Sequence, residues 1–453
     1  MLKPLSLACT LSACLMIASP PANAAALSDP FGVLSATPVR YCIDIQPSDE
    51  LSLADAVVLS LCRDPGLAGA IFSERNAQAA VGMAKAAYLP SLSLQGDVGR
   101  QSSTITGAST NSGNASDLTA SLSYVLFDFG KRRATLQQSL ANASVQRYAR
   151  VGTYQQVMLD TAADYIALIS LQLQAKAASD EAAAADEALT MASAKYKAGE
   201  VARSDVLQAK TVAAQARLTV VQAESTLRTA QAKLAVALGW PVNSPIRLTP
   251  AEVRDAAAAD LQPLDAMLAE AATARPDILA AKAQLQADGD QITIARAQYL
   301  PTLSVTASSG TSTLPGSPRT RTGSAMLSLR IPLFNGFERQ YSTAAATASR
   351  DQSAETLKSV QRAAALDVFT QREQLSTALS ALASANAFAD SASESVEVAL
   401  KQYKAGVGTM YDLLNAQSQL AQARTSVAQS YATLEQSRLA LAKALGQLSL
   451  DSL

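Results

Sequence analysis

The chain has 453 residues, enough for about two or three ordinary domains, yet aromatic residues make up 5% of it and histidine is absent. Its hydrophobic content is carried largely by alanine and leucine, which favours long helices packed through small side chains over a bulky globular core. With 37 Lys and Arg against 38 Asp and Glu, the formal net charge is -1, so the composition provides no basic surface for nucleic acid.

Residues 1–24 have the pattern of a secretory signal peptide. Lys3 is its positive start, Leu5 to Ala18 is its apolar run, and the small residues Ala22 and Ala24 mark a cleavage site. A second interpretation is a lipoprotein signal, because residues 11–14 resemble a lipobox that would lipidate Cys14, but the apolar stretch before Cys14 is very short. Either leader takes the mature protein out of the cytoplasm.

An N-terminal arm, residues 25–50, is expected to follow the signal. Cleavage after Ala24 leaves two cysteines, Cys42 and Cys62, with 19 residues between them. In an oxidising periplasm this pair can form a disulfide that contributes about 3 kcal/mol and ties the arm to the first helix. A metal site is disfavoured, because two thiolates without histidine do not complete a tetrahedral shell. We therefore expect a disulfide, and no metal or cofactor site.

The mature chain is an internal duplication. Residues 85–94, KAAYLPSLSL, return as residues 296–305, RAQYLPTLSV, and the motif Tyr-Lys-Ala-Gly at 196–199 returns at 403–406. Such self-similarity is typical of tandem structural repeats. We expect a first repeat at 51–239, a linker or equatorial segment at 240–262, a second repeat at 263–446 and a C-terminal tail at 447–453.

Each repeat contains a window in which apolar and polar residues alternate with a period of two, which predicts a β-hairpin at 89–127 and another at 300–334. Apolar positions on the expected lipid-facing side include Leu92, Leu94, Leu122, Leu327 and Leu329. The alternation is expected to continue through Leu126, and residues 101–117 and 309–322 are expected to be solvent loops. Each of the four expected strands is about ten residues long, which is the length that a tilted strand needs to cross a membrane.

Four strands cannot close a membrane barrel, because the smallest closed barrels have about eight. An open edge in lipid would leave backbone groups unpaired at several kcal/mol each. After the signal, the sequence has no apolar stretch of about 18 residues, so we expect strands to make the membrane contact. Oligomerisation must then close the sheet, with eight strands in a dimer or twelve in a trimer.

The rest of each repeat is predicted to be a long helical hairpin, at 130–238 and 337–446. No proline interrupts residues 130–199 or 339–406, so each outgoing helix of about 68 residues forms a rod of roughly 100 Å. The returning segments keep a heptad register of large and small residues, such as Val206 with Ala209 and Leu413 with Ala416. This pattern predicts antiparallel coiled coils. The expected fold class is mainly α, with a membrane β part.

The order and duplication of several short motifs resemble the TolC family of outer-membrane channel proteins over essentially the whole mature chain. The motifs are LADA at 53–56, Tyr-Leu-Pro at 88–90 and 299–301, LFD at 126–128 with LFN at 333–335, and the Tyr-Lys-Ala-Gly tips followed by Asp205 and Asp412. The resemblance implies a homotrimer with a twelve-stranded β-barrel in the outer membrane and a periplasmic α-helical barrel.

The function that the resemblance implies is an exit duct of a tripartite efflux or type I secretion system. Its partners would be outer-membrane lipid, a periplasmic adaptor (membrane fusion) protein and an inner-membrane transporter of ABC or RND type. A self-standing porin would leave the rods without a purpose, and a structural tether across the envelope would leave the amphipathic strands unexplained. Catalysis is not expected, since the sequence has no histidine for general base chemistry and no phosphate-binding loop.

The resemblance also implies that the two hairpin tips dock the adaptor. The tip residues are Ala198, Gly199 and Glu200 in the first repeat, and Ala405, Gly406 and Val407 in the second. Glycine suits a helix reversal, because the backbone angles needed there are opposed by a Cβ atom. The same glycines are equally consistent with simple turns.

A channel gate is implied close to the second tip. The resemblance places Asp412 in the lumen, where three carboxylates in a trimer would favour cations and could bind a multivalent ion. Asn415 stands one turn further on, where a second acidic layer would otherwise lie. The alternative for Asp412 is helix capping, since a negative charge suits a helix start. Asp205, the equivalent residue of the first repeat, is expected to brace neighbouring helices.

Overall fold

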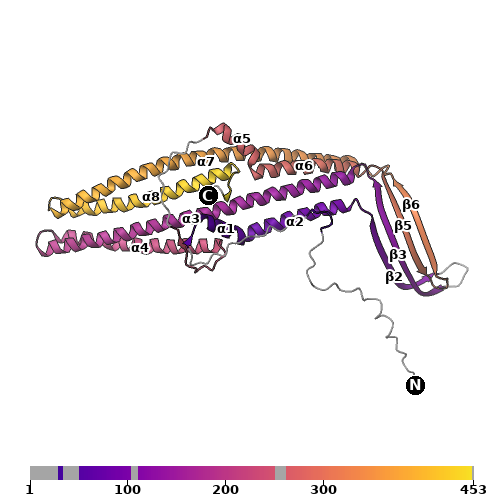
Figure 1. The fold of residues 1–453 in the computed structure, drawn as a ribbon, viewed down its shortest axis with the longest axis horizontal. Helices are drawn as coiled ribbons and strands as arrows, with labels where there is room; N and C mark the ends of the chain where they lie inside the picture. Colours follow the sequence, from indigo (N-terminus) through magenta and orange to yellow (C-terminus); the bar gives the residue numbers. More distant parts are fainter. Residues whose placement is uncertain (1–28, 34–49, 104–110, 250–261, 451–453) are drawn as a thin grey trace, which may run out of the picture.

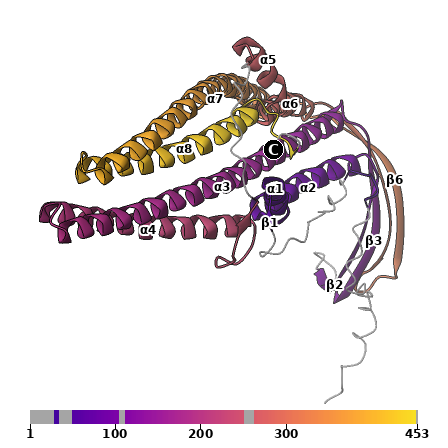
Figure 2. The ribbon, with the colours of Figure 1, turned by 60° about the vertical axis from the view of Figure 1, so that its left-hand side comes forward.

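The computed structural model describes residues 29–33, 50–103, 111–249 and 262–450, so the predicted signal, Cys14 and Cys42 lie outside the described residues. Long helices run side by side along most of the molecule, and a sheet stands at an angle at one end (Figure 1). A second view shows the two helical hairpins at one end of the molecule and the sheet at the other (Figure 2). The mainly helical fold class with a β part is confirmed.

Two rods form the frame of the molecule: α3 (Lys131–Lys197) and α7 (Glu338–Lys404), each 67 residues long. At about 1.5 Å per residue each spans roughly 100 Å. Half of each rod pairs with a returning helix of 35 residues, α4 (Arg203–Ala237) or α8 (Met410–Ala444). Along the other half, α3 packs on α2 (Pro65–Ala86), and both rods pack on α6 (Pro276–Ala297).

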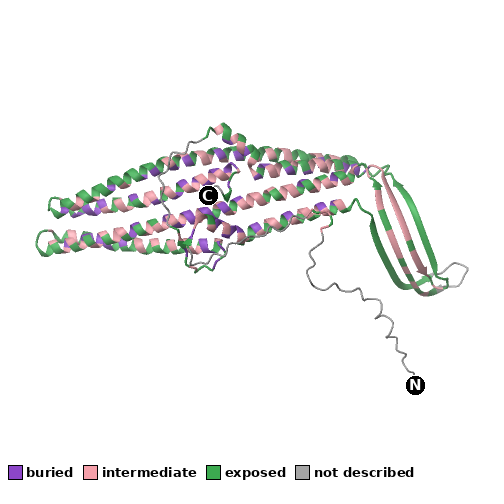
Figure 3. Ribbon diagram, in the orientation of Figure 1, coloured by how far each residue is buried: buried purple, intermediate pink, exposed green. Residues whose placement is uncertain are grey.

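Small side chains allow these helices to approach closely. Near the free ends of the first hairpin, Ala188 and Ala192 of α3 are fully buried together with Ala209 of α4. Alanine loses almost no side-chain entropy and keeps interaxial distances short. The burial pattern in Figure 3 shows buried residues as a broken line along the helices, with exposed positions on their outer faces. The core is therefore a series of thin seams.

Short helices precede the rods: α1 (Leu53–Arg63) and α5 (Leu264–Ala274). After each of them, one residue separates the helix end from a proline, Pro65 or Pro276, which begins α2 or α6. Proline at a helix start has the required φ and loses no hydrogen bond. No single described helix is long and apolar enough to cross a membrane; the pair α1 and α2, bent by 52°, passes the same test of length and composition.

An arginine holds the middle of each repeat together. Arg63 Nη1 donates to the carbonyl of Leu238 at 3.3 Å, and Arg275 Nη1 donates to the carbonyl of Ala444 at 3.0 Å. Both carbonyls lie at the end of a returning helix, where they have no partner within the helix. Arg275 also binds Asp367 at 2.7 Å. Arg63 is the last residue of α1, whereas Arg275 follows the last residue of α5, so the two arginines make a similar contact from positions that are not equivalent.

The linker contributes a contact that the sequence did not reveal. Residues Arg247–Leu248 form β4, which pairs in parallel with β1 (Glu50–Leu51). The Tyr165 hydroxyl donates to the carbonyl of Leu51 at 2.9 Å. This two-residue pairing carries no periodicity that a sequence pattern could display.

The four long strands form one antiparallel sheet in the order β2-β3-β5-β6. They are β2 (Ser91–Ser103), β3 (Asn111–Phe127), β5 (Thr302–Thr313) and β6 (Thr320–Arg330). The strands occupy 101–103, 111–117, 309–313 and 320–322, so the predicted solvent loops were too long at both ends. Residues 314–319 contain no strand, and residues 104–110 lie outside the described residues. Serine and threonine at strand ends still pair through their backbones, and that pairing does not depend on apolar alternation.

Cross-strand register places the five predicted leucines on one face. Leu92 lies opposite Leu122, which lies opposite Ala307, and Leu327 and Leu329 follow on the same side of β6. We call this side the leucine face. The alternation does not continue through Leu126 as expected, because a β-bulge between Val125 and Phe127 removes Leu126 from the ladder. Strands β2 and β6 are the two open edges.

Candidate functional site: the hairpin tips

Both hairpins reverse through a glycine in the left-handed region. Gly199 has φ 79° and Gly406 has φ 78°. The next amide closes each turn, from Glu200 to the carbonyl of Lys195 at 2.9 Å and from Val407 to that of Gln402 at 3.0 Å. These bonds satisfy carbonyls that the ending helix leaves without partners. A Cβ on either glycine would meet no atom within 4 Å, so the requirement is conformational.

The two turns then differ. Gly408, two residues after Gly406, passes so close to the end of α7 that a Cβ there would lie 2.9 Å from the Gln402 Cβ. It would also lie 3.1 Å from the backbone nitrogen of Tyr403, which cannot move aside easily. The equivalent position in the first repeat is Val201. Glycine is therefore required at position 408 because the end of α7 leaves no room for a side chain there. This role of Gly408 was not predicted from the sequence.

Asp412 forms a capping box at the start of α8. Its amide donates to Thr409 Oγ1 at 3.1 Å, while Thr409 donates to Asp412 Oδ2 through its hydroxyl at 2.6 Å and its amide at 3.3 Å. The capping interpretation of Asp412 is thus confirmed. Asp412 and Asn415 are both exposed and lie three residues apart, whereas Leu413 and Leu414 between them are buried. Both polar side chains therefore occupy one exposed side of α8.

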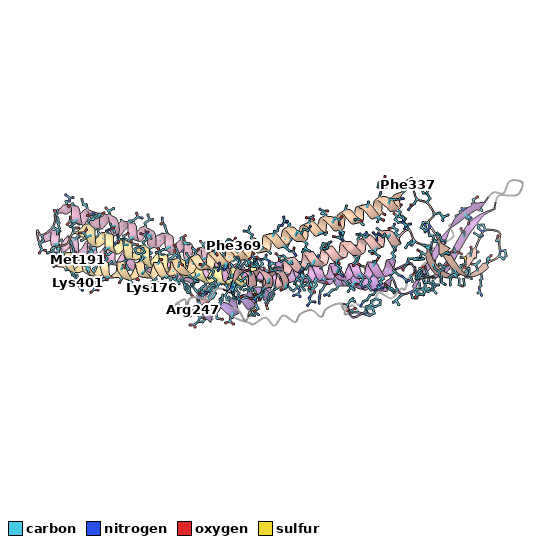
Figure 4. All side chains as sticks on the ribbon, turned by 90° about the horizontal axis from the view of Figure 1, so that it is seen from above. Lys176, Met191, Arg247, Phe337, Phe369 and Lys401 are labelled. Carbon is cyan, nitrogen blue, oxygen red and sulfur yellow. The ribbon has the colours of Figure 1, made fainter. Side chains whose placement is uncertain are left out.

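A cavity of about 660 Å³ lies where the two tips meet. Its lining includes Glu200, Asp205 and Gly406 among the predicted site residues, together with Lys195 and Tyr403, which the sequence analysis did not single out. Asp412, Asn415, Ala198, Ala405 and Val407 are not among the lining residues. Figure 4 labels Met191 and Lys401 close to this end of the rods and Phe337 at the opposite end beside the sheet.

Lys195 joins the two hairpins in this cavity. Its Nζ donates to the carbonyl of Tyr403 at 3.0 Å and lies 4.9 Å from the centroid of the Tyr403 ring. It also lies 3.8 Å from the Glu200 carboxylate. The ammonium group of the first hairpin therefore contacts a carbonyl, an aromatic face and a carboxylate, and two of these belong to the second hairpin.

Tyr403 is buried at this junction, and its hydroxyl has no hydrogen-bond partner among the described residues. Burial raises the pKa of Tyr403 above 10.0, and the negative charges of Asp205 and Glu200 raise it further. The phenol therefore stays protonated at neutral pH, and the residue lines the same cavity as the two carboxylates. In the first copy of the Tyr-Lys-Ala-Gly motif, the tyrosine is not buried. The exposed fraction is 46% for Tyr196 and 2% for Tyr403.

The predicted disulfide can be followed at one end only. Cys62 is disulfide-bonded near the end of α1, and Cys42 lies outside the described residues. Their pairing stays a prediction, which mass spectrometry under non-reducing conditions would test. Within the described residues, no group of three or more histidine, cysteine, aspartate or glutamate side chains could hold a metal ion.

A family model described as "Outer membrane efflux protein" matches residues 56–240 and 267–447 of the chain. The two matched stretches correspond to the two copies of the duplication and cover most of the chain.

Several characterised relatives align with most of the chain. Protein CyaE of Bordetella pertussis is 31% identical over 422 residues, covering 88% of this chain and 85% of that protein. The outer membrane efflux protein BepC of Brucella suis is 25% identical, covering 82% and 80% respectively. The pyoverdine export outer membrane protein OpmQ of Pseudomonas putida is 27% identical, covering 84% and 82%.

Solved structures share the fold at lower identity. The CusC structure superposes with a TM-score of 0.76 at 18% identity, covering 87% of this chain and 92% of that chain. The CmeC outer membrane channel of Campylobacter jejuni gives 0.76 at 19% identity, covering 87% and 85%. With the family model matching both repeats, these findings establish that the chain belongs to the outer membrane efflux protein family.

Proposed function

We propose that three copies of this chain assemble into a duct that carries substrate from the periplasmic side through the outer membrane. The observation that carries the proposal is the four-stranded sheet with two open edges, β2 and β6, joined to rods of roughly 100 Å. Open edges are not tolerated in lipid, so the sheet needs neighbours of the same kind. Three sheets of four strands provide twelve.

The helices support the same assembly. Apolar side chains stay exposed on the outer faces of α4 and α7, including Leu207, Leu218, Val221, Leu366 and Phe369. Exposed apolar rows along a helix are typical of faces that pack against another subunit. In a trimer α4 of one protomer would pack beside α7 of the next and close a helical barrel continuous with the strands. Such a barrel would give the duct its periplasmic length.

The tips are the proposed docking points for a periplasmic adaptor, which would connect the duct to an inner-membrane transporter. Their glycine turns stand at the free ends of both hairpins, at the end of the rods away from the sheet (Figure 1). Ala198, Gly199, Glu200, Ala405, Gly406 and Val407 would form this surface. Export proteins among the relatives, such as OpmQ, support transport as the activity.

The gate is proposed to lie just inside the tips. Asp412 would line the lumen and, with its two symmetry mates, favour cations, while Asn415 adds a polar but uncharged layer. Asp205 lines the same cavity as Tyr403, and we expect it to brace the neighbouring helices and so stabilise the closed state of the channel. Capping and lumen roles are compatible for Asp412, because the cap uses one carboxylate oxygen, Oδ2.

The experiment pairs a glycine substitution with an assembly assay. Replacing Gly406 by leucine strains a left-handed position where no atom lies within 4 Å of the added Cβ, so local geometry changes without a steric clash. We expect trimers by crosslinking in detergent, loss of adaptor co-purification and loss of export. Gly289→Leu, in an uncrowded position of α6 remote from the tips, is the matched control. Monomers in the unmodified protein would overturn the duct, whereas normal adaptor binding by Gly406→Leu would overturn docking at the tips.

A further inference from the structure

Charge is divided between the two faces of the sheet. On the leucine face, Arg321 lies opposite Thr311, which lies opposite Leu118, and Arg100 follows two positions after Val98 on β2. Arg319 reaches the same face, because its Nη2 donates to Thr311 Oγ1 at 3.3 Å. All three arginines are exposed. We call Arg100, Arg319 and Arg321 the outer arginine set.

The carboxylates of the sheet lie on the other face. Asp97 and Asp117 are directly opposite each other, one position out of phase with the leucines. Gln95 donates to Asp97 at 3.0 Å and Thr119 donates to Asp117 at 2.9 Å, and both donors share that face. Within the described part of the strands these are the only acidic residues, and residues 104–110 carry no charge in the sequence. The outer arginine set therefore has no carboxylate beside it on its own face.

The depth of the arginines can be measured along the strands. Arg100 lies nine residues beyond Ser91, the helix-side end of β2, and Arg321 lies nine residues before Arg330, the helix-side end of β6. Nine residues at about 3.4 Å span roughly 30 Å, and a tilt of about 40° reduces this to roughly 23 Å along the membrane normal. The apolar band of a membrane barrel is about 25 Å tall. Both edge strands thus carry an arginine at the far boundary of that band.

Aromatic residues mark the near boundary. At the junction of helices and sheet, Phe127 packs on Phe129 with centroids 4.7 Å apart, and Phe334 packs on Phe337 at 5.4 Å. These four rings are exposed, as is Tyr341. Exposed aromatic rings gather at membrane interfaces. The leucine face is therefore bounded by aromatic rings on the helix side and by guanidinium groups on the far side.

We propose that the outer arginine set binds the phosphate groups of a phosphorylated glycolipid in the outer leaflet of the outer membrane. The inference rests on the proposed trimeric closure, in which β6 of one protomer pairs with β2 of the next. Closure brings Arg319 and Arg321 of one copy to the same seam as Arg100 of its neighbour. Guanidinium groups form bidentate hydrogen bonds with phosphate, and basic clusters at a membrane surface attract anionic headgroups. Each trimer would then carry three such seams.

The test uses the full trimer in nanodiscs, with bisphosphorylated lipid A and its fully dephosphorylated form as probes, read out by native mass spectrometry. We expect the unmodified trimer to prefer the phosphorylated probe, and the preference to weaken as salt is raised. The variant R100Q/R319Q/R321Q should lose about tenfold or more of that preference, since each basic residue contributes about a factor of five. The control Arg330→Gln, opposite Thr302 on the other face, should keep it.

Equal binding of the two probes by the unmodified trimer would overturn the proposal, and this comparison needs no variant. An intact R100Q/R319Q/R321Q trimer that retains the preference would overturn it as well. Monomers of the unmodified protein in the same spectra would overturn the trimeric closure, and the seam with it. That outcome is separate from the loss of phosphate preference by intact trimers.

Discussion

The two hairpin tips share a motif and a backbone but not their chemistry. Both end in Tyr-Lys-Ala-Gly and reverse through a left-handed glycine. The tyrosine is exposed in the first copy, as Tyr196, and buried in the second, as Tyr403. The returning helix has no side-chain cap at Ala202 in the first copy, whereas Thr409 and Asp412 form a capping box in the second.

The difference shows how a duplicated chain can divide its tasks. The turn is kept twice because both hairpins must reverse, and that requirement concerns the backbone alone. The side chains around the turn are free to diverge, so the second tip acquires the buried ring and the first provides the lysine that covers it. The contact between the two tips therefore depends on residues that are not equivalent in the two copies.

The largest effect is expected from removing the buried ring. Tyr403→Ala should destabilise the tip region by about 3 kcal/mol, because the cavity left behind adds to the lost burial. Tyr196→Ala, at the equivalent exposed position, should cost within about 0.5 kcal/mol. Hydrogen exchange is measured on amides in the last turns of α7 for Tyr403→Ala and in the last turns of α3 for Tyr196→Ala. Similar protection in the two variants would remove the asymmetry between the tips.

Gly408 provides the next test. Gly408→Ala should cost about 1 to 3 kcal/mol locally, since the new Cβ would press on the Tyr403 backbone nitrogen. Val201→Ala, at the equivalent position of the first tip, adds no atom and should have little effect. Limited proteolysis at the second tip is the measurement. Resistance equal to that of the unmodified protein would mean that the turn relaxes freely.

Loss of the cap gives a smaller change. Asp412→Ala removes one carboxylate from the capping box at the start of α8 and should cost about 1 kcal/mol of local stability. Asp412→Ser tests the electrostatic part, because it keeps a short polar group without the charge. Hydrogen exchange over the first turn of α8 would report the difference. Identical exchange in all three proteins would contradict the capping role.

The smallest effect concerns the Tyr403 hydroxyl. Because the pKa of Tyr403 is raised in the folded protein by burial and then by Asp205 and Glu200, its neutral form is favoured by folding. The contribution of this group to the free energy of unfolding is fully present below pH 10 and is lost as the pH rises through the pKa of the folded protein. Tyr403→Phe should be neutral or slightly stabilising at pH 7, since it removes an unpartnered buried group. It should also reduce the loss of stability above pH 10; an unchanged alkaline profile would contradict this.

Much of the fold follows from the sequence, because it depends on periodicities that long elements repeat many times. The rods, the heptad rows around Ala209 and Ala216 and the leucine face all have such patterns. The β1 and β4 pairing has none, since two residues cannot show a period. Loop boundaries were missed because Ser and Thr at the strand ends resemble loop residues in composition.

The candidate site could be predicted only in part. Glycine at both turns and a cap at Asp412 are local requirements, visible in a few neighbouring residues. The contact between Lys195 and Tyr403 joins residues more than 200 positions apart, and the sequence offers two copies of the same motif without indicating which tyrosine is buried. Only the packing of one hairpin on the other decides that.

The most direct test of the proposed duct and its gate is ion selectivity in planar bilayers, compared between the two equivalent aspartates. Asp412→Ala should reduce cation selectivity and block by multivalent cations, because it removes the three carboxylates proposed to line the lumen. Asp205→Ala should keep the selectivity and loosen the closed state, since Asp205 lies in the cavity with Tyr403. Unchanged selectivity in Asp412→Ala, or equal loss in both variants, would contradict the division of roles between the tips.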